Sequence, residues 1–592
     1  MAETLISPGV FLNENDLSQI TQGPIAAGAA LLGPTVIGPV NIPTLVTSYS
    51  EYKAIFGAAF VTGGANFEYL TSIAALNYFE QGGDSLLVTR VASGSYLPAS
   101  ASVVTPTGTT SFELTTLSVG NLMNNYASGT AGPYASGSNG SLPSGSSANI
   151  RWEVTGVDTG SGVFSLVIRR GDDYNNSKTI LETWNNLSLD PNQNNYIAYV
   201  IGDQTETVRT DSTGDYYLQT TGSYQNKSRY VRVSAVNLPT PGYFSQTGQP
   251  QSQYTASFPQ TGSGAGNGGF QGGTGAIFGC FGKAAVNLFE SIPSTNSIPA
   301  TPNTNIQGVH PSDYAVAINL LQNKDAYSIN VIYAPGLNSQ NAATTSSAIL
   351  NLAQDRGDAI AVVDMVSYGA QINAVIGQAN LYDNSYGATY WPWVQIRSRE
   401  TGKVNFVPAS TLVPAVYEYN DKVSAEWFAP AGLNRGALST VLQPERKLTV
   451  NDRNILYQGK VNPIATFPGV GTVIYGQKTL QQKPSALDRV NVRRLLIALK
   501  DYIGQIGETI VFEPNTQVTR NKFLNQVNPY LESVQQRQGL YAFQVVMDET
   551  NNTPDVVDRN QLVGTNYLQP TKTAEFIQLD FNILPTGTTF GQ

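Results

Sequence analysis

The sequence is short of the side chains on which most enzyme and metal sites depend. Its 592 residues include one cysteine, Cys280, and one histidine, His310. One cysteine excludes an intrachain disulfide and argues against a cysteine-based metal site. A Ser-His-Asp triad would have to use His310, and no serine lies in a G-x-S-x-G motif. Because His310 precedes Pro311 at an expected helix start, a capping or surface role is favoured over catalysis.

Charge and long apolar runs are also scarce. Charged residues make up 13% of the chain, and 33 basic against 42 acidic residues give a net charge of −9. This acidic balance argues against a protein that coats nucleic acid, which needs a basic surface. No stretch approaches the roughly 20 apolar residues of a membrane span, and the first residues lack the basic start and apolar run of a secretory signal. We therefore expect a protein made in a cytosol, with no membrane insertion and no nucleic-acid partner.

The remaining chemical motifs are incomplete. Gly282-Lys283 is followed by alanine, where a phosphate loop needs serine or threonine. The acidic pair Asp172-Asp173 follows two arginines in an expected turn, which favours a solvated turn over a metal site. Trp391 and Trp393 flank a proline beside an expected strand, where core packing or a subunit contact is favoured over a sugar platform. We predict no catalytic, cofactor-binding or metal-binding residues, and a protein that is not an enzyme.

What the sequence does contain indicates several domains. The chain is too long for one core, and 56 glycines and 31 tyrosines with little charge are typical of β-rich, loop-rich particle or extracellular proteins. Helical and apolar strand patterns alternate on both sides of a long polar stretch, residues 93–305, which favours a parallel sheet covered on both faces. The clearest of these elements are a helix at 67–80, a strand at 85–91 and later strands at 329–336, 359–365 and 390–396.

The polar stretch is interpreted as a β-rich insertion that splits the α/β domain. Two parts of it are expected to fold: a hairpin over 150–170, where two alternating runs flank a Gly-rich turn, and the segment 196–234. The remainder, above all residues 261–275, is expected to be loop or linker.

The C-terminal part has the clearest helical patterns. Ser485 begins a predicted helix with apolar residues at helical spacing up to Ile506, and a second runs from Thr516 to about Gln538, followed by a strand at 540–549. Three basic residues of the first helix lie roughly on one face, which is solvated or meets an acidic partner. They are Arg489, Arg493 and Lys500.

The two ends of the chain have apolar residues that need a partner. Val10, Phe11 and Leu12 form a small cluster on a polar arm, and residues 574–584 alternate as a strand does, with Ile577, Leu579, Phe581 and Ile583 on one face. The last strand either belongs to the chain's own sheet, completing a helix, helix, strand, strand domain, or is donated to a neighbouring subunit.

Several segments together resemble contractile bacteriophage tail sheath proteins. They are SPGVFLNENDLS and GPVNIPTLVTSYSEYKAIFG near the start, residues 169–203, WPWVQIRSRETGKVNFVPAS, and, most specifically, RNILYQGKVNPIATFPGVGTVIYGQKTL, residues 512–554 and the closing strand. The resemblance implies an α/β and α+β multidomain fold. Its expected parts are an N-terminal arm (1–22), a split subtilisin-like sheath domain (23–92 and 306–464), an inserted, protruding β-rich region (93–305), an inner C-terminal domain (465–573) and a C-terminal strand or arm (574–592).

The resemblance also implies a function and a set of partners. The arms would complete the sheets of neighbouring copies, and a helical polymer would contract around a tail tube without nucleotide, driving the tube through a host envelope. Arg489, Arg493 and Lys500 are then candidates to face the tube. Expected partners are further copies, the tube protein, and baseplate and tail terminator proteins, in a virion assembled in the host cytoplasm. The alternatives are the sheath of a phage-like contractile injection system or bacteriocin and, from another class, a hydrolase or glycan-binding particle protein.

Overall fold

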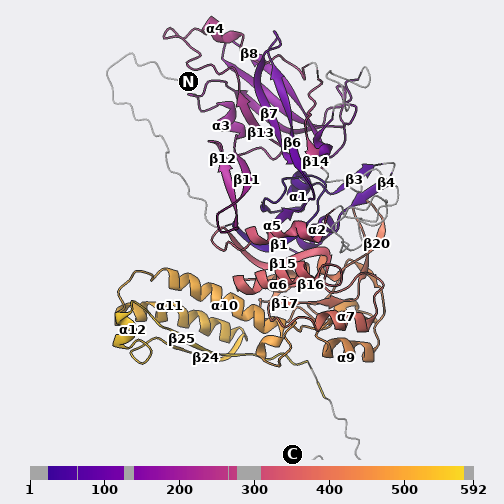
Figure 1. Cartoon of the computed structure of the whole chain (residues 1–592), viewed down its shortest axis with the longest axis vertical. Helices are drawn as coiled ribbons and strands as arrows, with labels where there is room; N and C mark the ends of the chain where they lie inside the picture. Colours follow the sequence, from indigo (N-terminus) through magenta and orange to yellow (C-terminus); the bar gives the residue numbers. More distant parts are fainter. Residues whose placement is uncertain are drawn as a thin grey trace, which may run out of the picture.

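The computed structural model describes residues 25–62, 65–125, 139–264, 266–275, 309–575 and 577–578. Figure 1 shows a long molecule with a β-rich part at one end, a central sheet covered by helices, and two long helices at the other end. The predicted mixed α/β, multidomain character is confirmed. Within the described ranges, no helix is long and apolar enough to cross a membrane.

The central sheet has six strands in the order β17-β16-β15-β1-β5-β2, all parallel except β2, which runs antiparallel to β5. The strands are β1 Ile25–Gly33, β2 Thr44–Val46, β5 Leu86–Arg90, β15 Tyr327–Asn338, β16 Ile360–Asp364 and β17 Gly387–Ala388. Strands from before and after residues 93–305 therefore lie side by side in one sheet. The subtilisin-like topology remains a prediction.

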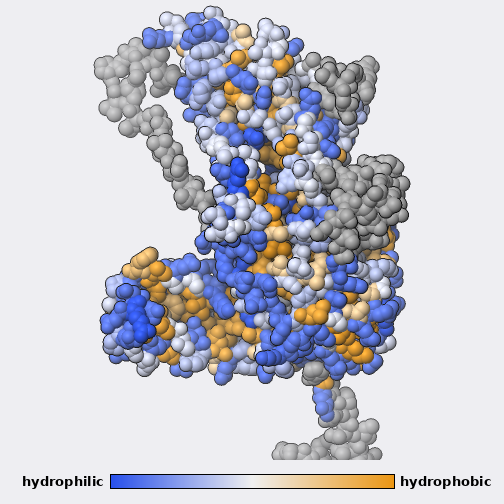
Figure 2. Space-filling view, in the orientation of Figure 1, coloured by the Kyte–Doolittle hydropathy of each residue, from blue (hydrophilic) through white to orange (hydrophobic). Residues whose placement is uncertain are grey.

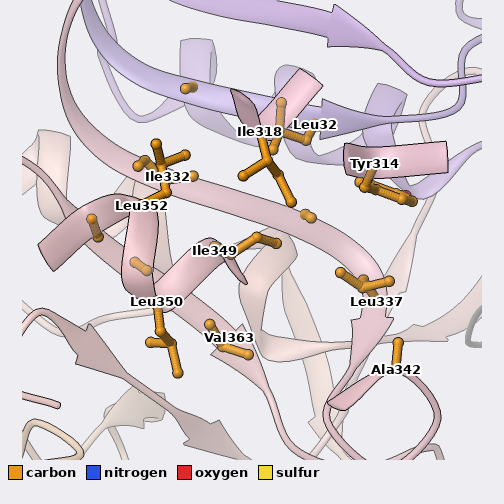
Figure 3. Close-up of a cluster of buried hydrophobic side chains, with 14 of the residues drawn as sticks. Leu32, Tyr314, Ile318, Ile332, Leu337, Ala342, Ile349, Leu350, Leu352 and Val363 are labelled. Atoms are coloured by element: carbon orange, nitrogen blue, oxygen red, sulfur yellow. The ribbon is translucent and has the colours of Figure 1, made fainter. Parts of the chain in front are cut away.

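Helices cover both faces of this sheet because successive strand residues point to opposite sides. Leu32, Ile332 and Val363 enter one buried cluster, which Figure 3 shows with Tyr314 and Ile349 from the covering helices. Their neighbours Leu31, Val331 and Val362 enter the cluster on the other face. The helices are α1 Tyr49–Phe56, α2 Leu70–Glu80, α5 Tyr314–Leu320, α6 Ala343–Arg356, α7 Ile372–Ala379 and α8 Val413–Val423. The predicted helix at 67–80 thus begins at Leu70, after the hairpin of β3 Ala59–Thr62 and β4 Ala65–Glu68.

The stretch 390–396 was predicted to close the parallel series, and this prediction is wrong. Its residues are divided between β18 Tyr390–Trp391, which pairs with β22 Asn462–Phe467, and β19 Val394–Arg397, which pairs with β20 Val404–Val407 and β21 Val441–Pro444. Trp391 and Trp393 are buried, as the core-packing interpretation expected. An apolar run reports burial but not the sheet to which a strand belongs, and Pro392 has no N–H for a continuous ladder.

The described residues of the insertion form a four-stranded and a three-stranded antiparallel sheet and a separate hairpin, β11–β12. The predicted hairpin at 150–170 is confirmed as β8 and β9. The strands β6 and β7 were not predicted. Residues 261–264 and 266–275 are no free linker, because the backbone N–H of Trp152 donates to Gly268 at 2.9 Å and Phe270 is fully buried. The elements are β6 Tyr96–Val104, β7 Thr110–Val119, β8 Ile150–Asp158, β9 Val163–Arg170, β10 Ile180–Leu187, α3 Ile197–Ile201, β11 Thr205–Thr210, β12 Tyr216–Thr221, β13 Val231–Val236, α4 Ser252–Thr255 and β14 Thr274–Gly275.

The C-terminal part begins with β22, which pairs antiparallel with β23 Gly471–Ile474. The predicted domain boundary between residues 464 and 465 lies within β22. Helix α9 Val450–Gln458 precedes this pair. The long helices α10 Val490–Glu508 and α11 Gln517–Gln536 follow, then β24 Leu540–Val546, α12 Pro554–Asp558 and β25 Thr565–Pro570. Short 3-10 turns complete the list at Asn121–Met123, Pro311–Asp313, Ala409–Thr411 and Ala486–Asp488.

Candidate functional site

Two long helices form the framework of the C-terminal part, as the sequence predicted. The Ser485 hydroxyl accepts from the N–H of Leu487 at 3.1 Å, just before α10, and the Thr516 side chain caps α11. The tyrosines Tyr502 and Tyr530 stack across the two helices with ring centroids 3.7 Å apart. The shared core contains Leu495, Leu499, Ile506, Phe523, Val527, Leu531 and Val534. Each helix therefore buries one apolar stripe and presents its other face outward.

Strands β24 and β25 pair with each other in a two-stranded antiparallel sheet that packs beside α11. The partner of β24 is Thr565–Pro570, a strand that the sequence did not predict, whereas most of the predicted strand at 574–584 lies outside the described residues. In the described part of the chain, each of the two strands has one hydrogen-bonded neighbour. A two-stranded sheet is marginal on its own, and its outer edges carry backbone groups that a further strand can use.

Apolar side chains are exposed on this part of the molecule. Figure 2 shows apolar surface over the region formed by α10 and α11. Phe512, in the turn between the two helices, is fully exposed, and its neighbour Val511 is 58% exposed. Tyr541 and Tyr567 on the small sheet are 62% and 59% exposed. Contiguous exposed apolar surface on a soluble protein commonly marks a contact with a partner.

Most of the predicted arm residues lie outside the described residues. These are Val10, Phe11, Leu12, Leu579, Phe581 and Ile583. Ile577 is described, and it is 76% exposed. Residues 574, 575, 577 and 578 belong to no strand of this chain.

The three basic residues predicted to share a face have different environments. Arg493 is buried, with its guanidinium 4.1 Å from the ring centroid of Tyr386 and Nη2 donating to Ser385 at 2.7 Å, and burial lowers its pKa. Arg493 is therefore engaged within the chain, and its role toward a tube stays a prediction. Lys500 is exposed, with Nζ 3.3 Å from the Tyr386 hydroxyl.

Arg489 is turned toward the end of the chain. Its Nε and Nη2 donate to the two carboxylate oxygens of Glu575 at 2.7 and 3.0 Å, and its Nη1 lies 2.9 Å from Asp488. Burial alone would lower the pKa of Arg489, but the bonds to Glu575 raise it. The charge of Arg489 is thus balanced within the chain, which leaves Lys500 as the exposed cation of the predicted face.

The residues considered for chemistry are engaged in structural contacts. The backbone N–H of His310 donates to Asp313 at 2.7 Å at the start of the turn Pro311–Asp313, as expected of a capping position. Asp364, which the sequence did not single out, is buried at the end of β16 and accepts from the Ser410 hydroxyl at 2.5 Å, and burial raises its pKa to about 7. No group of three or more potential metal ligands occurs among the residues that the structure describes.

Asp173 contradicts the prediction of a solvated acidic turn. It is 3% exposed, and its two carboxylate oxygens accept from Nη2 and Nε of the buried Arg169, each at 2.8 Å. The neighbouring Asp172 remains partly exposed beside Arg170. The signal that sequence reasoning missed is the pair of arginines directly opposite each other on β8 and β9, Arg151 and Arg169, both fully buried.

Comparisons with known proteins give one family. Residues 307–480 match the phage tail sheath protein central domain, and residues 482–583 match the phage tail sheath C-terminal domain. The tail sheath protein of Vibrio phage KVP40 is 40% identical over 187 residues, which is 32% of this chain and 28% of the phage protein. That of Salmonella phage ViI is 29% identical over 47% of this chain and 44% of the phage protein. The chain thus spans less than half the length of these relatives.

Among solved structures, the sheath tail protein Lin1278 from Listeria innocua overlaps 93% of this chain and 96% of its own, with 11% identity and a TM-score of 0.49. The relatives matched by sequence are tail sheath proteins, which are structural proteins. Two segments of the chain, residues 307–480 and 482–583, are thus similar to the central and C-terminal domains of phage tail sheath proteins.

Proposed function

We propose that the chain is a structural subunit of a contractile phage tail sheath, which polymerises helically around the tail tube and contracts to drive the tube through a host envelope. The observation that carries this proposal is the match of residues 307–480 and 482–583 to the two tail sheath domains. The chain would act without catalysis of its own, and its place would be in the virion, after assembly in the host cytoplasm.

Polymerisation would use backbone pairing between copies. The small sheet β24–β25 supports this step, because no other strand among the described residues pairs with its outer edges, which a neighbour's strand can use. The donated segments would be the N-terminal arm with Val10, Phe11 and Leu12, and the C-terminal arm with Ile577, Leu579, Phe581 and Ile583. Ladder hydrogen bonds join subunits independently of side-chain packing, so the bodies can repack while the arms keep the lattice connected.

Contraction would be a change between two packings of the same folded subunits. The free energy would be stored when the extended lattice assembles, so no nucleotide is required. Lys500 and the exposed apolar residues near Phe512 are candidates to contact the tube protein. Baseplate and tail terminator proteins would bind the two ends of the polymer.

The test is truncation followed by electron microscopy. Deleting residues 576–592, or residues 1–22, is expected to leave a folded monomer that forms no tubes, because each deletion removes a strand that a neighbour needs. The control replaces the exposed residue Glu549 with glutamine, in a turn of the same domain, and should assemble as the wild type does. Normal tubes from both truncated chains would refute the strand-exchange mechanism, and discrete oligomers with hydrolytic or sugar-binding activity would refute the sheath proposal.

A further inference from the structure

The point where the C-terminal arm leaves the body is held by a set of directed bonds. The Glu575 carboxylate accepts the two hydrogen bonds from Nε and Nη2 of Arg489 described above, and a third from Nε2 of the buried Gln477 at 3.1 Å. The same Nε2 donates to the hydroxyl of Thr573 at 2.6 Å. We call Gln477, Arg489, Thr573 and Glu575 the arm latch. Its members come from two separate parts of the chain, one before α10 and one after β25.

The electrostatics of the latch favour its closed form. Burial alone would raise the pKa of Glu575, but the bonds from Arg489 and Gln477 lower it, so the carboxylate is charged when paired. A bidentate arginine–carboxylate pair fixes both distance and angle, and this pair is largely shielded from solvent, with 24% and 18% of the two side chains exposed. Such a pair holds a segment in one direction more firmly than a single surface contact does.

The segment 570–575, which leads to the C-terminal arm, is held to the body by the latch and by a second set of hydrogen bonds. Upstream, the N–H of Thr571 donates to Gly539 at 3.2 Å and its hydroxyl donates to Gln538 at 2.6 Å, at the start of β24. Downstream, Ile577 is already 76% exposed. A cavity of about 380 Å³ lies between the first turn of α10 and the segment 570–575, lined by Val492, Pro570 and Ala574 among others. The segment is therefore held at Thr571 and, through the latch, at Thr573 and Glu575, with the cavity beside it.

From this geometry we infer that the latch sets the direction in which the C-terminal arm leaves the body and so presents the arm to a second copy of this chain. Two fixed points four residues apart define a direction, whereas Thr571 alone leaves the segment free to swing. Presenting a strand in one direction raises its effective concentration at the neighbour's sheet edge and lowers the ordering cost of pairing. Arg489 is then a positioning residue for assembly and not a contact to the tube. The inference rests on the proposed sheath function.

Charge reversal tests the latch in the full chain. Glu575→Arg and Arg489→Glu are expected to reduce the yield of tubes about tenfold at equal protein concentration, because the arm loses its fixed direction. The double variant, which restores an opposite-charge pair, should recover most of the yield. Glu549→Arg, at an exposed position of the same domain, is the matched control and should assemble normally. If a single reversal does not fold, Glu575→Gln replaces it, with the same expected loss.

A second measurement separates positioning from general stability. Hydrogen exchange of the unassembled chain should be faster in the single variants over residues 570–575 and unchanged in α10 and α11, and the double variant should match the wild type. Tubes of normal yield from both single variants would overturn the latch and leave the sheath proposal intact. Failure of the wild-type chain to form tubes would overturn the sheath proposal, and the latch with it.

Discussion

Replacing Asp173 with asparagine is expected to destabilise the insertion strongly. Asp173 balances two arginines that are both fully buried: Arg169 through the two bonds at 2.8 Å, and Arg151, whose Nη1 lies 3.4 Å from Oδ1. Its Oδ2 also accepts from the backbone N–H of Thr179 at 2.9 Å. In the Asp173→Asn variant an amide N–H₂ would face donors of Arg169, and the negative charge would be gone.

The magnitude follows from the charges that remain. The cluster holds Arg151, Arg169 and Lys178 against Asp173 and Glu153, and Glu153 already bonds Arg169 and Lys178 at 2.8 and 2.7 Å. Without Asp173, three cations face one carboxylate in a site where two of them have no access to water. Removing one partner of a buried ion pair costs about 3–5 kcal/mol. The neighbour Asp172 pairs with Arg170 at the surface, so Asp172→Asn should cost less than about 1 kcal/mol.

Hydrogen exchange of the strands that carry the arginines measures this difference locally. Amides of β8 and β9 that exchange through opening of the insertion should exchange at least about 100-fold faster in Asp173→Asn, since each 1.4 kcal/mol corresponds to about tenfold. Asp172→Asn, one residue away and with the same change of chemistry, serves as the control and should alter these rates by less than about tenfold. Equal exchange rates in the two variants would refute the reasoning that Asp173 is the essential counter-ion.

Two further predictions concern pH and the basic face of α10. Burial raises the pKa of Asp364 to about 7, so its contribution to stability is complete below its ordinary pKa near 4 and is lost as the pH rises to about 7. The unfolding temperature should therefore fall over that window, and Asp364→Asn should flatten the fall; an unchanged pH profile in the variant would contradict the assignment. Arg493→Met should lower the free energy of unfolding by about 1–2 kcal/mol through loss of the Tyr386 and Ser385 contacts. Lys500→Glu should leave urea denaturation unchanged and weaken assembly on purified tube protein. A loss of stability in Lys500→Glu together with unchanged stability in Arg493→Met would refute the assignment of Arg493 as the buried and Lys500 as the exposed cation.

The helices of the C-terminal part were predictable because local signals agree there. Ser485 and Thr516 stand where the structure places caps, and the apolar spacing of the following residues matches the buried faces of α10 and α11. The same is true of β15 and β16, whose continuous apolar runs reflect burial on both faces of the sheet. Spacing could place Arg489, Arg493 and Lys500 on one face, but not show that Ser385 and Tyr386 cover the middle of it.

Other features depend on contacts that the local sequence does not contain. β25 has only intermediate and exposed residues, so no apolar alternation announces it, and its position follows from pairing with β24. β6 contains small residues such as Ala99 and Ala101, and a segment of such composition is typical of a loop. Asp173 was taken for a surface residue because the burial of Arg151, 22 positions earlier, becomes visible only in the folded sheet.

The way the insertion is joined to the body bears on the contraction proposed above. Arg90, fully buried at the end of β5, donates to Gly38 at 2.5 Å and to Val119 of the insertion at 3.4 Å. Where the chain enters and leaves the insertion, the backbone N–H of His310 donates to the Ser93 hydroxyl at 3.2 Å. The insertion is thus hydrogen-bonded to the central sheet domain at two places: at Arg90, where β5 ends, and at the Ser93–His310 pair, where the chain enters and leaves the insertion. Breaking these buried hydrogen bonds would leave polar groups unsatisfied, whereas repacking the contacts between copies would not break them. A contraction that preserves the folded subunit would therefore carry the insertion with the body, and the motion would take place at the interfaces between copies.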